Sequence, residues 1–159
     1  MESAVLRVPF SEAARTLFLA ALVLLGMVAW LSARALRLPA ASPDRLVAEL
    51  RLAQLAAIVL AFAAGAWPGL AAAHEAMPGV GLDVAIALGF LVVAVTAPLR
   101  DPHEALTILA LAFAAHAGAD LLHRPGLLPE AIAPRWFAAG CAVHNVVAGV
   151  LCYVPLLRR

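Results

Sequence analysis

The sequence contains no lysine, and charged residues of any kind make up only 13% of its 159 residues. A soluble domain usually has about 25% charged residues and about 45–50% apolar ones. Hydrophobic residues make up 65% of this chain, and its mean hydropathy is +0.97. A small globule could not bury so much apolar surface, because its ratio of surface to volume is high. The composition therefore excludes a soluble domain and predicts an integral membrane protein whose partner is the lipid bilayer.

Two further absences exclude other classes of protein. All 11 basic residues are arginine and the net charge is +1, with no basic stripe of the kind that a nucleic-acid-binding protein needs. The only cysteines are Cys141 and Cys152, with no C-x-x-C motif, so neither a zinc ribbon nor a thioredoxin-type site is indicated. Along one helix they are about 16 Å apart, which is too far for a disulfide.

Five apolar runs are long enough to cross a hydrocarbon core of about 30 Å, which takes roughly 20 helical residues. None of them shows the period-2 alternation of a barrel strand. The sequence therefore predicts an all-α fold, a polytopic transmembrane helix bundle in a single integral membrane domain over residues 1–159. The expected helices cover residues 14–37, 44–67, 81–97, 103–123 and 135–154.

Proline and capping residues mark where these helices begin and end. Ser42 and Asp101 each precede a proline, the pattern of an N-cap followed by proline at the first helical position. Pro68 is expected to break or kink the second helix, and Pro98 to end the third. The three tryptophans fall near helix ends and are expected to be interfacial anchors: Trp30, Trp67 and Trp136.

Arginine is unevenly distributed between the two membrane faces. One face has seven (Arg34, Arg37, Arg45, Arg51, Arg100, Arg158 and Arg159) and the other has four (Arg7, Arg15, Arg124 and Arg135). The positive-inside rule then predicts a cytoplasmic C-terminus and an external N-terminus. The Ala-rich, Lys-free composition favours the inner membrane of a high-GC bacterium. The alternative for the first run is a cleaved signal peptide with a small-residue cleavage site at 33–35.

Antiparallel neighbouring helices bring most of the polar residues to one membrane face. The residues expected there are His74, Glu75, Asp83, Asp120 and His123. His116 and His144 lie deeper from the same face, at a common height on sequential helices. His116, Asp120 and His123 have i, i+4, i+7 spacing and therefore form one stripe. Asn145, the only asparagine, is next to His144.

One interpretation of this group is a metal site. His116 and His144 would be the ligands of a divalent metal, with Asp120 as a third ligand or as the carboxylate that orients a histidine. Two histidines, one carboxylate and an open position suit zinc or non-haem iron, and could support hydrolysis of a lipid-like substrate. The entrance or second shell would comprise His123, His74, Glu75, Asp83 and Asn145.

Three other interpretations stay open. Two histidines at one height on facing helices are also the geometry of bis-His haem ligation. Alternatively, His116, Asp120, His144 and Asn145 bind no cofactor and only hydrogen-bond between helices, as in a structural or accessory subunit. The third interpretation is a pathway for protons or a solute through the membrane. A small-residue face at Ala53, Ala57 and Ala61 would permit a homo-oligomer or a place in a larger membrane complex.

The segment from Ala115 to His123, followed by Trp136, Cys141 and the pair His144 and Asn145, resembles a family of small uncharacterised bacterial integral membrane proteins. That family has an H-x-x-W-D-x-x-H-H type segment at the end of an apolar helix. Here Ala119 replaces the tryptophan and Arg124 the second histidine. The resemblance covers about the last third of the chain. It implies a polytopic membrane protein and suggests that His116, Asp120 and His123 belong together.

Overall fold

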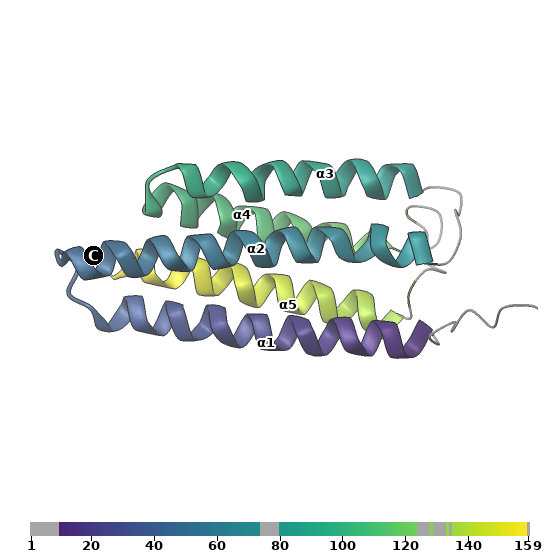
Figure 1. Cartoon of the computed structure of the whole chain (residues 1–159), viewed down its shortest axis with the longest axis horizontal. Helices are drawn as coiled ribbons and strands as arrows, with labels where there is room; N and C mark the ends of the chain where they lie inside the picture. The colour runs from purple at the N-terminus through teal and green to yellow at the C-terminus, as the bar shows by residue number, and fades with distance from the viewer. Residues whose placement is uncertain (1–9, 74–79, 124–127, 129–132, 134, 159) are drawn as a thin grey trace, which may run out of the picture.

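The computed structural model describes residues 10–73, 80–123, 128, 133 and 135–158, which form an antiparallel bundle of five long helices (Figure 1). The helices are α1 (Phe10–Arg37), α2 (Pro43–Ala73), α3 (Val80–Thr96), α4 (Pro102–Leu121) and α5 (Arg135–Tyr153). Two short 3₁₀ helices, η1 (Ala97–Leu99) and η2 (Val154–Leu157), follow α3 and α5. These described ranges contain no strand, so the prediction of an all-α fold is confirmed.

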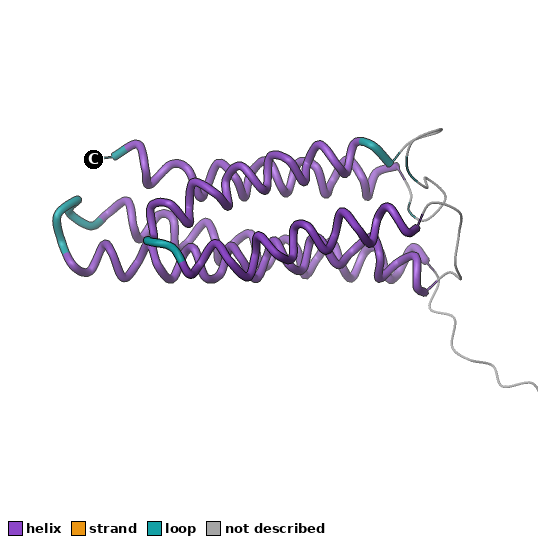
Figure 2. Tube along the Cα trace, turned by 90° about the horizontal axis from the view of Figure 1, so that it is seen from above, coloured by secondary structure: helices purple, strands orange, loops and turns teal. Residues whose placement is uncertain are grey.

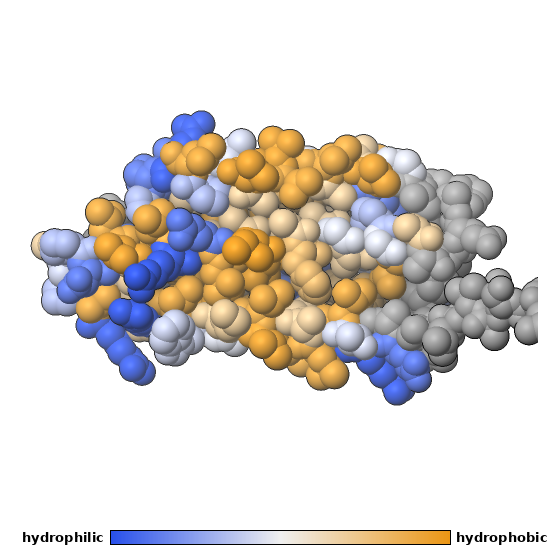
Figure 3. Space-filling model, in the orientation of Figure 1, coloured by the Kyte–Doolittle hydropathy of each residue, from blue (hydrophilic) through white to orange (hydrophobic). Residues whose placement is uncertain are grey.

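Each of the five helices is long and apolar enough to cross a membrane. The spanning stretches are Arg15–Arg37, Pro43–Ala72, Gly81–Leu99, Pro102–Leu121 and Arg135–Leu157. Figure 3 shows apolar residues over the middle of the bundle and hydrophilic residues mostly toward its ends. By length and composition the chain is therefore a multi-pass membrane protein, as the apolar runs predicted.

Two helices begin at the N-caps that the sequence indicated. The hydroxyl Oγ of Ser42 accepts a hydrogen bond from the backbone N–H of Arg45 at 3.2 Å. The carboxylate of Asp101 accepts from the backbone N–H groups of the second and third residues after it, at 3.1 and 3.2 Å. These bonds satisfy N–H groups that have no partner inside the helix.

Pro68 does not end α2, so the expected boundary at residue 67 is wrong: the helix continues to Ala73. A proline inside a helix removes one backbone hydrogen bond, and membrane helices tolerate this loss because neighbouring helices and local adjustments compensate for it. Trp67 and Leu70, on either side of Pro68, pack with Phe137 of α5 in one buried cluster. Burial of these side chains holds the turn beyond the proline in helical form.

The core lies where α2, α4 and α5 meet, while α1 and α3 lie on opposite outer sides of the bundle (Figure 1). Seen at a right angle to that view, the helices still run along the common long axis (Figure 2). Phe113 of α4 and Leu60 of α2 are fully buried in this core. Ala53 and Ala57, considered above as a face for oligomers, are 0% and 5% exposed and pack inside the same core. That face is therefore used within the chain itself.

The antiparallel order brings the start of α3, the end of α4 and the start of α5 to one end of the bundle (Figure 1). Asp83 lies in the first turn of α3 and Asp120 in the last turn of α4, so both lie at this end, as expected. His123 lies two residues after the end of α4. His74 and Glu75 fall outside the described residues.

Candidate functional site

Asp120 is the centre of a buried hydrogen-bond network between α2, α4 and α5. Only 1% of its surface is exposed. Its Oδ1 accepts a hydrogen bond from the indole Nε1–H of Trp67 at 2.9 Å, and its Oδ2 accepts from the amide Nδ2 of Asn145 at 2.7 Å. A buried carboxylate needs donors to replace the water it has lost. Here two other helices supply those donors.

Asn145 also contacts His116, one turn before Asp120. Its Nδ2 lies 3.0 Å from the ring Nδ1 of His116, which is itself 3.5 Å from Oδ2 of Asp120. An amide nitrogen only donates, so Nδ1 accepts, and the neutral ring carries its proton on Nε2. The reverse amide orientation would place the carbonyl oxygen of Asn145 against the carboxylate. We call Trp67, His116, Asp120 and Asn145 the central network.

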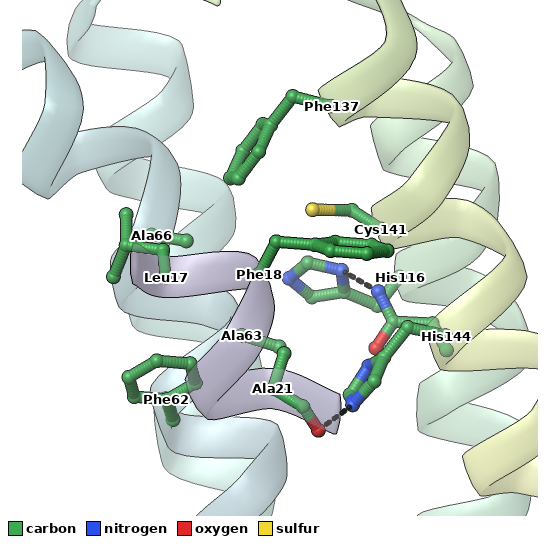
Figure 4. A pocket seen from close by; sticks show the side chains of 11 residues that line it. Leu17, Phe18, Ala21, Phe62, Ala63, Ala66, His116, Phe137, Cys141 and His144 are labelled. Atoms are coloured by element: carbon green, nitrogen blue, oxygen red, sulfur yellow. Dashed lines mark hydrogen bonds between the residues drawn. The ribbon is translucent and has the colours of Figure 1, made fainter. Parts of the chain in front are cut away.

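His144 contacts α1 and also borders the central network, because it lines one cavity with His116 and Asn145. Its Nε2 lies 3.2 Å from the backbone carbonyl oxygen of Ala21, and a carbonyl can only accept, so this nitrogen carries the proton. His116 and His144 line one cavity of about 30 Å³. The other walls of this cavity are mainly apolar side chains such as Phe18 and Phe62 (Figure 4). A water molecule needs roughly 10–15 Å³ of such space. The two histidines therefore meet at a cavity with room for very small occupants.

Two of the residues expected at the entrance, Asp83 and His123, also come together. Nε2 of His123 lies 3.2 Å from Oδ1 of Asp83, and these side chains are 4% and 1% exposed. The other ring nitrogen of His123, Nδ1, lies 3.2 Å from the backbone carbonyl oxygen of Ala119. The imidazole stacks on the indole of Trp67, with ring centres 3.5 Å apart and an angle of 7° between the planes. We call Asp83 and His123 the interfacial pair.

Hydrogen bonds already use the groups that were expected to bind a metal. Both oxygens of Asp120 and Nδ1 of His116 face donors, and Nε2 of His144 donates to a carbonyl. Among the residues that the structure describes, no three His, Cys, Asp or Glu side chains form a group that could hold a metal ion. The zinc or iron site at His116, Asp120 and His144 therefore stays a prediction.

The haem interpretation likewise stays a prediction. Ligand pockets usually measure roughly 300–1,000 Å³, whereas the cavity shared by His116 and His144 measures about 30 Å³. Nε2 of His144, one of the nitrogens that could bind a haem iron, lies 3.2 Å from the carbonyl oxygen of Ala21 in α1.

Trp67 is the main site residue that sequence reasoning assigned wrongly. It is 4% exposed, so it is not an interfacial anchor, whereas Trp30 and Trp136 are 62% and 45% exposed. One feature of the sequence did point to a contact between Trp67 and Asp120: both residues lie at helix ends on the same membrane face. An indole N–H in a buried position usually needs an acceptor, and Asp120 is that acceptor.

A second buried polar contact lies at the opposite end of the bundle. Arg45, considered above only as one arginine in the charge comparison, is 4% exposed. Its Nε pairs with Oε1 of Glu49 at 2.9 Å, and one terminal nitrogen donates to the carbonyl oxygen of Pro155 at 2.6 Å. The i, i+4 spacing of Arg45 and Glu49 was a signal for this pair. The link to the end of the chain had no signal in the sequence.

Comparisons of the chain with protein-family models, curated proteins and solved structures found no match. The resemblance built on His116, Asp120 and His123 therefore stays a prediction.

Proposed function

We propose that this chain is a structural or accessory membrane protein in which the central network joins the helices of the bundle. One observation carries the proposal. The amide of Asn145 in α5 contacts both Asp120 and His116 in α4, while Trp67 in α2 contacts the same carboxylate. Each residue of the central network thus contacts a residue on another helix.

Polar contacts of this kind are important in a membrane because burial of apolar surface gives little preference for one helix over lipid. An interhelical hydrogen bond contributes on average about 0.6 kcal/mol and at most about 1.7 kcal/mol in bacteriorhodopsin. The network also sets the register of α5. A slip by one helical turn, about 5.4 Å, would separate Asn145 from both of its partners at once.

The proposal predicts that Asn145→Leu destabilises the bundle. The substitution leaves Oδ2 of Asp120 and Nδ1 of His116 buried without a donor. The interhelical bonds contribute about 0.6–1.7 kcal/mol each and a buried group without a partner costs about 1–3 kcal/mol, so we expect a loss of about 1–3 kcal/mol in the free energy of unfolding. Unfolding of the purified protein in detergent micelles, followed by circular dichroism, measures this loss.

Gln54→Leu is the matched control. Gln54 carries the same kind of carboxamide on the exposed side of α2, so we expect its loss to change stability by less than about 0.5 kcal/mol. Equal stability of the two variants would contradict a structural role for the central network.

A further inference from the structure

We infer that the interfacial pair, Asp83 and His123, is a binding site for one divalent transition-metal ion such as Zn²⁺. The pair lies where α3 begins and α4 ends, close to the membrane face. The indole of Trp67 connects it to the central network, since its face stacks on His123 while its N–H bonds to Asp120. The inference stands independently of the structural role proposed for the central network.

Unsatisfied polar atoms are the first observation. Oδ1 and Oδ2 of Asp83 and Nε2 of His123 are buried, and none makes a well-aligned hydrogen bond in the described part of the chain, although Oδ1 and Nε2 lie 3.2 Å from each other. A buried polar atom without a partner costs about 1–3 kcal/mol, and more when it is charged. Folded proteins leave few such atoms. Three of them on two neighbouring side chains indicate a bound group that interacts with both.

The bond made by Nδ1 of His123, the ring nitrogen that faces away from Asp83, indicates that the bound group is a cation. Nδ1 of His123 lies 3.2 Å from the carbonyl oxygen of Ala119, which can only accept, so Nδ1 carries a proton. In the neutral ring Nε2 then has a lone pair. That lone pair lies 3.2 Å from Oδ1 of Asp83, which is also an electron-pair donor. A cation between these two atoms, either a proton or a metal ion, would remove the repulsion between their lone pairs.

The 3.2 Å separation suits a metal ion. Zinc binds histidine nitrogen and carboxylate oxygen at about 2.0–2.2 Å. With bonds of that length, two ligand atoms 3.2 Å apart subtend roughly 100° at the ion, between the octahedral and tetrahedral angles. The ion would lie off the line that joins its ligand atoms. This agrees with the poor alignment of Nε2 and Oδ1 for a direct hydrogen bond.

A proton on His123 is the alternative to a metal ion, and it would satisfy fewer of the buried polar atoms. A proton on Nε2 of His123 would serve Oδ1 of Asp83 at best and would leave Oδ2 unsatisfied. A divalent ion keeps bound water in its remaining positions, and that water can donate to Oδ2. One imidazole and one carboxylate are ligands typical of Zn²⁺ and similar ions.

The test is a titration of the full-length chain in detergent, purified without a polyhistidine tag and stripped with a chelator. Zn²⁺ binding is followed by calorimetry, and Co²⁺ by its visible absorption bands, which report nitrogen and oxygen ligands. We expect one ion per chain in the parent, at least about tenfold weaker binding in Asp83→Asn and His123→Gln, and a rise in Tm with Zn²⁺ in the parent only.

Glu104→Gln and His103→Gln are the matched controls, because they remove the same two kinds of side chain at the opposite end of the bundle. Both should bind the ion as the parent does. Absence of binding in the parent, or unchanged affinity in Asp83→Asn and His123→Gln, would overturn the inference. Loss of binding confined to His116→Ala and His144→Ala would also overturn it, and would place the metal at the deeper histidines. None of these outcomes bears on the unfolding of Asn145→Leu.

Discussion

The indole of Trp67 does two separate things at the scale of a single residue. Its N–H donates to Asp120 at 2.9 Å, and its face stacks on His123. Its edge also meets Phe137 in a T-shaped contact with ring centres 5.6 Å apart. The N–H therefore belongs to the central network and the ring face to the interfacial pair, so a substitution that keeps an aromatic ring tests the first role.

Trp67→Phe is expected to lower the free energy of unfolding by about 2–3 kcal/mol, because a carboxylate loses a donor and the smaller ring leaves a void. Trp30→Phe, at a position 62% exposed, should change it by less than about 0.5 kcal/mol. A double-mutant cycle in an Asp120→Leu background separates the two effects. The cost of Trp67→Phe should fall there, and an unchanged cost would show that only ring volume was lost.

Residue spacing predicted part of the site and missed the rest. The i, i+4 spacing placed His116 and Asp120 on one face, and the 3.5 Å distance between them follows from helical geometry. The partner of Asp120 on α2 depended on the path of the chain beyond Pro68, where local rules predicted a helix end. Trp67 was therefore assigned to the interface instead of the core. Hydrogen bonds such as that from His144 to Ala21 depend on side-chain rotamers, which spacing does not determine.

At the scale of helices, α4 and α5 form the most extensive pair, and a glycine sets how closely they approach. A Cβ atom added at Gly149 would lie 3.1 Å from the backbone oxygen of Ala110 and 3.3 Å from Cβ of Phe113. Small residues at a helix contact permit such a close approach in membranes. The same pair of helices carries Asn145 and Asp120, so their separation affects the central network.

Gly149→Val should force α4 and α5 apart and lower the free energy of unfolding by about 1–3 kcal/mol. Gly118→Val is the control, because a Cβ at Gly118 would meet nothing within 4 Å. Comparison of the two variants by circular dichroism during unfolding in detergent measures the difference. If they unfold alike, the close approach at Gly149 does not limit the packing of α4 on α5.

Helix boundaries could be predicted well where the signals are local. The N-caps at Ser42 and Asp101 begin α2 and α4 as expected, since capping involves only residues within one turn. Pro68 was misleading because the outcome there depends on a distant contact, the packing of Trp67 and Leu70 with Phe137. Apolar length predicted that five helices span the membrane, but not which of them pack together.

At the scale of the whole molecule, buried polar contacts join helices toward both ends of the apolar core. The central network and the interfacial pair lie toward one end. Toward the other end Arg45 pairs with Glu49, and the hydroxyl of Ser32 donates to the carbonyl oxygen of Leu151 at 2.7 Å. The two ends therefore differ chemically: one joins helices through a carboxylate and imidazoles, the other through a guanidinium and backbone carbonyls.

The excess of arginine at the Arg45 end predicts that this end faces the cytoplasm. Two exposed positions report the orientation: Leu99, 80% exposed at the Arg45 end, and Leu122, 41% exposed at the Asp120 end. In a background with both native cysteines replaced by alanine, Leu122→Cys should react with a membrane-impermeant maleimide in spheroplasts of a bacterial host. Leu99→Cys should react only after the membrane is permeabilised. The reverse pattern would show that the arginine-rich end faces outward, against the charge rule.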